Sequence, residues 1–191
     1  MSRPREFDVD DVLHQCMEVF WEKGFKSTSY EDLTRSTGVK KQSLYCVFND
    51  KRSLFLKSLA HYRSYSIGVL KELDAEDKSP LSKLEALLDS LLSDEMMSRG
   101  CMMVNTSLEF GTDDAQISRE VELLFVESVQ IIERIIRNGQ EQQLITERYT
   151  SQELAAYLNN AILGARTLGR SGVAPEQIKA VLQTSFAMIL A

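Results

Sequence analysis

Apolar side chains recur at spacings of three and four residues along most of this chain. The first run places Val9, Val12, Leu13, Cys16 and Phe20 on one face of a helix. Only 3 prolines and 9 glycines occur among the 191 residues, which leaves few of the turn signals that separate strands. The sequence therefore predicts an all-α fold, and its length suits one sizeable domain or two small helical ones.

The composition is that of an ordinary soluble globular protein, with 43% apolar and 26% charged residues. No stretch approaches the ~18 consecutive apolar residues that a membrane span requires. The N-terminal segment "MSRPREFDVDD" soon turns acidic and lacks the apolar run of a secretion signal. We therefore expect a cytoplasmic protein without a membrane partner.

The residue types that bind metals or carry out catalysis are scattered along the chain. Cys16, Cys46 and Cys101 are odd in number, far apart and without metal-ligand spacing. His14 and His61 are isolated in the sequence, and neither has an acid or cysteine beside it to form a nucleophile-base pair. The sequence therefore predicts no metal site, no cofactor and no enzymatic activity.

Capping residues and glycines set the expected limits of the N-terminal helices. Asp8 begins a first helix that ends at Gly24, and a short second helix ends at Gly38. The second helix has two candidate capping boxes, Thr28 with Glu31 and Ser29 with Asp32. A third helix spans about 41–48, so two short helices joined by a glycine turn form a helix-turn-helix.

The rest of the chain divides in the same way. A fourth helix, capped by Asp50, runs over about 51–73 and ends at the acidic stretch "DAEDKS", the best candidate for a domain boundary. The later helices are expected after Ser79-Pro80, over about 114–142, from Thr150 and from Pro175. Between them, Gly100 and Gly111 bracket the apolar segment "CMMVNTSLEF".

Positive charge is concentrated near the third helix, although the whole chain has a net charge of -6. Residues 34–57 contain six basic residues and only one acid, Asp50, which gives a local charge of +5. A local basic patch on an acidic protein is the pattern expected of a phosphate-binding surface.

The stretch "KKQSLYCVFNDK" has the side chains that a DNA-reading helix needs. Leu44 and Phe48 lie one turn apart and face the protein, which leaves the opposite flank to polar residues. On that flank, Gln42 is suited to adenine in the major groove, and small Ser43 permits a close approach. Tyr45, at the far end of the helix, is placed for phosphate contact.

Residues 28–55, "TSYEDLTRSTGVKKQSLYCVFNDKRSLF", closely resemble the DNA-binding motif of the TetR transcription regulators. The resemblance implies about nine helices, with a helix-turn-helix domain over 1–50 and an effector-binding and dimerisation domain over 51–191. It also implies a homodimer, formed by the last two helices, that binds double-stranded DNA at a palindromic operator. The DNA contacts that we expect on this basis are Thr28, Lys40, Lys41, Gln42, Ser43, Tyr45, Cys46 and Lys51.

Most regulators of this kind are repressors that a small-molecule effector releases from DNA, so the same is expected here. The candidate effector pocket comprises Met102, Met103, Asn105, Leu108, Phe110, Phe125 and Arg166. Apolar pockets and apolar cores share a composition, so these residues fit the core equally well. For the dimer, apolar residues recur along both C-terminal helices, including Leu158, Ile162, Leu168, Ile178, Val181, Leu182 and Phe186.

Two alternatives to an effector-released repressor stay open at this point. The chain departs from the family pattern at Lys40, Gln42, Cys46 and Val47. The departures at Lys40, Cys46 and Val47 are the only support for the first alternative, a helical small-molecule binding module that has lost DNA affinity. Cys101 follows a glycine, as in some regulators that respond to oxidants or electrophiles, so a thiol-based repressor is the other alternative. A buried Cys101 that only packs in the core is the ordinary reading of a free cysteine.

Overall fold

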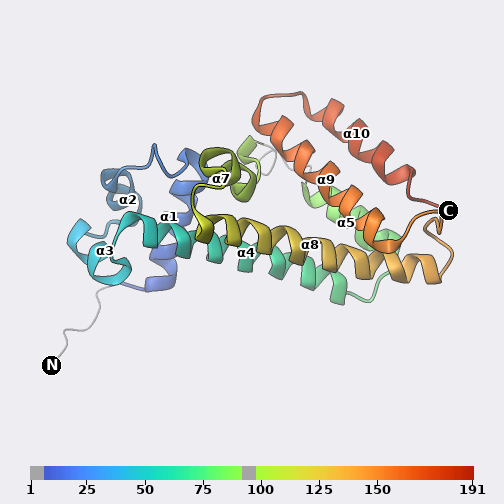
Figure 1. Cartoon of the computed structure of the whole chain (residues 1–191), viewed down its shortest axis with the longest axis horizontal. Helices are drawn as coiled ribbons and strands as arrows, with labels where there is room; N and C mark the ends of the chain where they lie inside the picture. Colours follow the sequence, from blue (N-terminus) through green and yellow to red (C-terminus); the bar gives the residue numbers. More distant parts are fainter. Residues whose placement is uncertain (1–6, 92–97) are drawn as a thin grey trace.

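The computed structural model describes residues 7–91 and 98–191, and within these residues it contains nine α-helices and no β-strand (Figure 1). The N-terminal helices α1, α2 and α3 gather at one end, while α4 and α8 run along the length of the molecule. The helices are α1 (Val9–Lys23), α2 (Tyr30–Thr37), α3 (Lys41–Phe48), α4 (Lys51–Ala75), α5 (Pro80–Leu91), α7 (Met102–Phe110), α8 (Ala115–Glu141), α9 (Ser151–Arg170) and α10 (Pro175–Ala187). The all-α prediction is confirmed.

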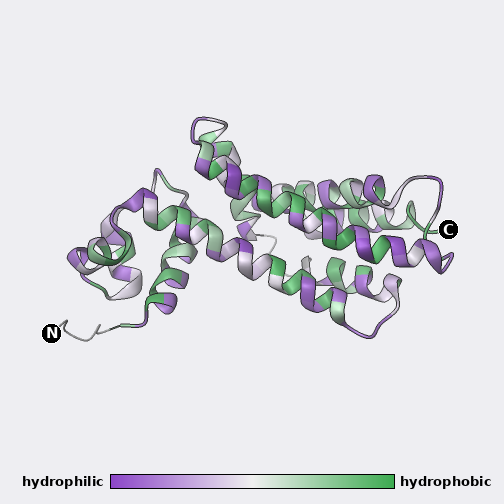
Figure 2. Ribbon diagram, turned by 60° about the horizontal axis from the view of Figure 1, so that its bottom comes forward, coloured by the Kyte–Doolittle hydropathy of each residue, from purple (hydrophilic) through white to green (hydrophobic). Residues whose placement is uncertain are grey.

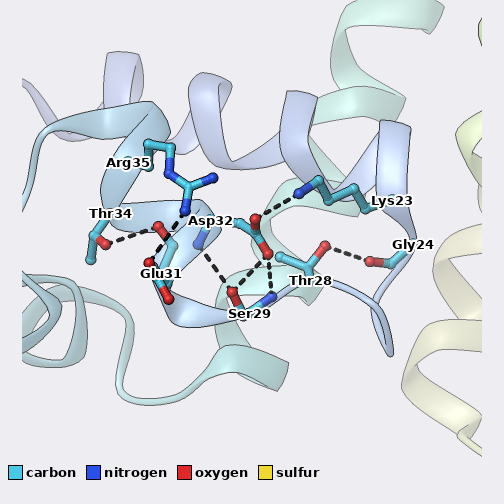
Figure 3. A network of polar contacts seen from close by, with 8 residues as sticks. All are labelled: Lys23, Gly24, Thr28, Ser29, Glu31, Asp32, Thr34 and Arg35. Carbon is cyan, nitrogen blue, oxygen red and sulfur yellow. Dashed lines mark hydrogen bonds and ion pairs between the residues drawn. The ribbon is translucent and has the colours of Figure 1, made fainter.

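Helix caps formed by side chains fix the N-terminal helices where the sequence predicts them. The Asp8 carboxylate accepts the backbone N–H groups of residues 10 and 11, and α1 ends at Gly24. Of the two candidate boxes before α2, the one that forms is Ser29 with Asp32 (Figure 3). Gly38 then ends α2 with φ of 68°, in the left-handed region that glycine adopts without strain.

Helix α4 connects the two ends of the molecule. It begins at Lys51, directly after the Asp50 cap, and ends at Ala75, close to the predicted limit of 73. It packs against α1 near its start and against α8 along its length. A division of the chain at residue 50 therefore stays a prediction, since α4 belongs structurally to both sides.

An aromatic cluster joins the helix-turn-helix end to the rest of the protein. The Phe55 ring of α4 lies 5.0 Å from Phe20 of α1 and 5.1 Å from Phe25 in the following loop. Phe55 also stacks at 5.7 Å on Phe110, the last residue of α7. Because aromatic pairs at these centroid distances attract beyond their buried area, the cluster ties α1, α4 and α7 together.

The C-terminal part consists of α5, α8, α9 and α10 around a second core, with apolar and polar segments alternating along each helix (Figure 2). Helix α9 begins after a Thr150–Glu153 capping box, and α10 begins at Pro175, both as predicted. Much of the apolar pattern that was expected to form a dimer interface instead packs inside the chain. The residues buried in this way are Leu158, Ile162, Ala165, Ile178, Leu182, Phe186 and Ile189. Leu168 and Val181 stay exposed.

Gly139 in α8 marks a close helix contact that a methyl group would disturb. A Cβ atom there would lie 2.5 Å from Cδ1 and 2.9 Å from Cγ1 of Ile145, which is itself buried. We expect Gly139→Ala to lower the free energy of unfolding by about 1–2 kcal/mol, because overpacking outweighs the gain in helix propensity. Urea unfolding followed by circular dichroism measures this change. In α4, Gly68→Ala is the control: its Cβ meets nothing within 4 Å, so it should stabilise, and equal effects would contradict the packing argument.

No helix in the described part of the chain combines the length and the apolar character needed to cross a membrane.

Candidate nucleic-acid interface and effector cavity

The outer flank of α3 carries four of the predicted DNA contacts side by side. Lys41, Gln42, Tyr45 and Cys46 are exposed and together line one open, shallow surface. The inner flank places Leu44 and Phe48 in the core, which holds the helix against α1, α2 and α4. The polar flank is therefore presented outward on a helix whose opposite side is packed.

Two tyrosines and a lysine form a stacked group at this surface. The Tyr45 ring lies 4.7 Å from the ring of Tyr30, the first residue of α2, at an interplanar angle of 28°. The Lys41 Nζ lies 4.8 Å from the Tyr30 centroid and 5.7 Å from that of Tyr45. Stacking and cation–π attraction thus limit the movement of Tyr45 before any partner binds. Sequence reasoning missed Tyr30, which appears in the motif only as an aromatic residue at the start of α2.

Three further predicted contacts lie around this surface. Lys40 is the exposed N-cap of α3 and forms no side-chain cap, so its ammonium group stays available. Ser43 is half-buried beside Gln42. Lys51 is half-buried too, with its Nζ 4.5 Å from the Phe25 ring centroid, and burial lowers the pKa of Lys51.

Thr28 does not face outward, which corrects its assignment as a DNA contact. Its side chain is buried, with the residue only 1% exposed, and its hydroxyl donates a 2.6 Å hydrogen bond to the Gly24 carbonyl (Figure 3). The physical reason is that Ser29, not Thr28, caps α2. Thr28 instead closes the turn between α1 and α2.

The local charge of +5 overstates the charge available to a polyanion. The Arg52 guanidinium makes two hydrogen bonds, of 2.7 and 2.8 Å, to Asp114, and this interaction lowers the pKa of the Asp114 carboxyl. Arg35 pairs at 3.3 Å with Glu31, which lies one turn earlier on α2 (Figure 3). The exposed positive charge closest to Gln42 is therefore that of Lys40 and Lys41.

A cavity of about 240 Å³ lies between α4, α5, α8 and α9. It contains two of the predicted pocket residues, Phe125 and Arg166, and also Cys101. Its walls are mainly apolar, with a few polar groups among them, as is usual for small-molecule sites. The residues that line it are Tyr62, Tyr65, Ser66, Val69, Leu70, Leu87, Ser90, Cys101, Leu124, Phe125, Ser128, Ile132, Asn159, Ile162, Leu163 and Arg166.

The other five predicted pocket residues lie elsewhere, because α7 packs mainly against α8 and places its buried side chains in the N-terminal core. Met102 and Met103 are in the N-terminal core, and Phe110 belongs to the aromatic cluster. Leu108 is 77% exposed, and the Asn105 amide donates to the Arg99 carbonyl at 3.4 Å. Sequence reasoning missed Tyr62, Ser128 and Asn159, whose only signal is a polar residue at a core-facing position.

The three cysteines differ in surroundings. Cys16 is in the core, Cys46 is exposed on α3, and Cys101 is the buried N-cap of α7. The Tyr62 hydroxyl lies 3.7 Å from the Cys101 Sγ. Burial raises the pKa of the Cys16 thiol to about 12, as expected of an inert core cysteine.

The two histidines, isolated in the sequence, meet in space. The Nδ1 of His14 and the Nε2 of His61 are 3.4 Å apart, across the contact between α1 and α4. Among the described residues, no three His, Cys, Asp or Glu side chains are arranged to hold a metal ion. The histidine pair therefore has no third ligand within the described part of the chain.

Family models match this sequence at both ends. One described as "Bacterial regulatory proteins, tetR family" matches residues 12–57, and one described as "Tetracyclin repressor-like, C-terminal domain" matches residues 80–184, more than half of the chain. The chain belongs to the TetR family. The regulators of this family are not enzymes, in agreement with the sequence-based expectation.

Relatives of this TetR-family chain match it over most of its length. The transcriptional repressor ComR of Escherichia coli is 27% identical over 188 residues, covering 96% of this chain and 90% of ComR. The uncharacterised regulator YezE of Bacillus subtilis is 32% identical over 174 residues, covering 85% of this chain and 86% of YezE.

Solved structures of TetR-family regulators share this fold. A regulator from Agrobacterium tumefaciens superimposes with a TM-score of 0.86 at 20% identity, covering 95% of this chain and 97% of that one. A cysteine mutant of CifR, solved in complex with 26-bp double-strand operator DNA, superimposes with a TM-score of 0.83 at 25% identity. That match covers 98% of this chain and 100% of the CifR chain.

In this TetR-family chain, polar contacts connect the cavity side of the molecule to the helix-turn-helix. The Glu109 carboxylate of α7 accepts the backbone N–H groups of Phe25 and Lys26, at 2.8 and 2.5 Å. The Arg170 guanidinium at the end of α9 donates to the carbonyls of Trp21 and Glu22 at the end of α1. A displacement of α7 or α9 would therefore act directly on α1.

Proposed function

We propose that this TetR-family transcriptional regulator is a repressor that binds a palindromic operator as a homodimer and is released by a small-molecule effector in the cytoplasm. The observation that carries the proposal is the outward polar flank of α3, where Gln42 lies between the exposed charges of Lys40 and Lys41 and the stacked ring of Tyr45. The CifR complex with operator DNA and the repressor ComR support it by analogy.

The contacts divide into base reading and backbone positioning. Gln42 is exposed and polar, so it reads adenine in the major groove, while half-buried Ser43 lets the helix approach the bases. Lys40, Lys41 and Tyr45 contact phosphates and fix the register of the helix without selecting sequence. Cys46 lies at the edge of the groove, and Lys51 approaches phosphate from the start of α4.

The dimer forms through the outer faces of α9 and α10. Four large apolar side chains stay exposed here: Tyr157 and Leu168 on α9, Val181 on α10 and Met188 directly after α10, with Val181 exposed by 55%. The Tyr157 hydroxyl lies 3.9 Å from the Met188 sulfur, so these two residues belong to one surface. Gly164 is exposed between Tyr157 and Leu168, where its small size permits close helix packing in a four-helix interface.

Selection from randomised duplex DNA at physiological salt tests the DNA-binding part of this proposal. The wild-type protein should enrich a palindrome. Gln42→Ala should change the consensus at one position per half-site, a loss of about 1–3 kcal/mol of discrimination. Tyr45→Phe keeps the stacking with Tyr30 but removes the hydroxyl, so it should weaken all sequences alike.

The control for the selection is Glu85→Ala, an exposed position on α5 that should leave the consensus and the affinity unchanged. If the wild-type protein enriches no sequence, and binds only in a manner that moderate salt abolishes, the chain is a helical binding module without operator recognition.

A thiol signal is the second candidate, favoured by the place of Cys101 in the cavity wall. An oxidant or electrophile small enough to enter the cavity would meet this thiol beside Tyr62 and Arg166. Modification of Cys101 would then change the same contacts that a bound effector changes.

A further inference from the structure

Arg166 is a buried cation that has no acidic partner among residues 7–91 and 98–191. It lies on α9, only 8% exposed, in the wall of the cavity. One guanidinium nitrogen donates to the Gly100 carbonyl at 2.7 Å and to the Tyr62 hydroxyl at 3.2 Å, while the Nε makes no hydrogen bond. A buried polar nitrogen without a partner is uncommon in folded proteins.

Neither partner of Arg166 carries a negative charge. Burial raises the pKa of Tyr62, so its phenol is neutral at physiological pH, and the Gly100 carbonyl is a dipole only. An arginine stays protonated in proteins, so the positive charge of Arg166 is present, and neither of these two partners compensates it. Within residues 7–91 and 98–191, no carboxylate lies within ion-pair distance of this guanidinium.

Arg63, on the same helix as Tyr62, shows how the protein treats a partly buried arginine elsewhere. It pairs with Glu120 at 3.1 Å and with Glu127 at 2.7 Å, both on α8. Carboxylates therefore compensate the charge of Arg63 where it bridges α4 and α8. Around Arg166, the space that a carboxylate partner would occupy is the cavity. Burying an unpaired charge there lowers the stability of the fold, and a bound anion would restore it.

The cavity also limits the size and character of that anion. Its volume of about 240 Å³ is below the ~300–1,000 Å³ of pockets for drug-sized ligands, so the occupant is small. Leu124, Phe125 and Ile162 form an apolar wall, which favours a hydrocarbon or aromatic body. Asn159 and Ser128 are the buried polar groups that remain to orient it.

We infer that the cavity binds a small organic carboxylate, with its carboxylate paired to the Arg166 guanidinium and its apolar body against Leu124, Phe125 and Ile162. This inference rests on the proposed function, since it names the chemical class of the effector. A carboxylate at Arg166 competes with the contacts of Arg166 to Gly100 and Tyr62. The Tyr62 ring packs edge-on at 5.0 Å against Trp21 of α1, so a shift of Tyr62 reaches the helix-turn-helix.

The test compares three probes that share a phenylpropyl body: 3-phenylpropanoate, its neutral amide and 3-phenylpropylamine. Titration calorimetry with the full chain, without DNA, should show binding of the carboxylate alone. Arg166→Met removes the charge at similar length and should weaken carboxylate binding by at least ~30-fold, as when one partner of a buried charge pair is lost. Arg119→Met, the same substitution at an exposed arginine of α8 outside the cavity wall, is the matched control and should bind the carboxylate like the wild type.

A second readout separates a binding role from a structural one. Without ligand, Arg166→Met should melt at the same temperature as the wild type or higher, because an unpaired buried charge is removed. If this variant does not fold, the inference is still tested by comparing how tightly the wild-type protein binds the carboxylate and the amide. Equal binding of the amide and the carboxylate, or undiminished binding to folded Arg166→Met, overturns the inference.

The same titrations distinguish this inference from the proposed function. If the carboxylate binds but leaves operator affinity unchanged, the result supports the anion site and contradicts its role as the effector site. If the protein binds its operator but binds neither the carboxylate nor its analogues, the result supports the proposed regulator and contradicts the anion site.

Discussion

Replacing Gly164 with lysine is expected to convert the protein from a dimer to a monomer and to lower operator affinity by at least ~100-fold, since specific binding exceeds single-module binding by such factors. In the isolated chain, a Cβ at Gly164 meets nothing within 4 Å, so a side chain there is accommodated. Lysine is also a better helix former than glycine, by about 0.5–1 kcal/mol. The expected loss of the dimer and of operator affinity would therefore arise at the contact with the partner subunit. In the dimer, the lysine side chain and its charge would lie against that subunit.

Light scattering after size-exclusion chromatography gives the mass, and an operator titration gives the affinity. The control is Gln130→Lys, which adds the same charge at an exposed position of α8. A dimer that persists in Gly164→Lys with full operator affinity would show that the outer face of α9 is not the interface. A Gly164→Lys variant that stays dimeric but melts below the wild type would instead point to contacts of Gly164 within the chain.

Phe55→Ala is expected to lower the free energy of unfolding by about 3–5 kcal/mol, a large part of the stability of a domain. Phe55 is buried and contacts the rings of Phe20, Phe25 and Phe110, so its removal leaves a cavity beside these three rings. Because these rings come from α1, the following loop and α7, the loss weakens the attachment of the helix-turn-helix to the rest of the chain. Operator affinity should fall with it.

Urea unfolding followed by circular dichroism and by Trp21 fluorescence measures the effect, since Trp21 lies in α1 close to the cluster. Coincident transitions from the two signals would show that both ends unfold together. The control is Val126→Ala on the exposed side of α8, where a change within about 0.5 kcal/mol is expected. A loss below about 1 kcal/mol for Phe55→Ala would contradict the role given to the cluster.

The sequence by itself determined the helices and the face of α3 that points outward. Caps such as Asp8 and Thr150 and the stop at Gly38 act within three or four residues, so their signals are complete in the local sequence. The same holds for Leu44 and Phe48, whose spacing of one turn fixes the opposite flank to solvent. The TetR resemblance depended on these local features.

Only the tertiary structure decided which apolar and polar residues meet. Met102 and Met103 have the composition of a pocket, but α7 turns them into the N-terminal core. Thr28 and Ser29 both fit a capping box, but the packing of the turn buries Thr28 and leaves Ser29 to cap α2. Arg166 contacts Tyr62, which is 104 positions away in the sequence, and Gly100, which is 66 positions away, and helical periodicity carries no information over such distances.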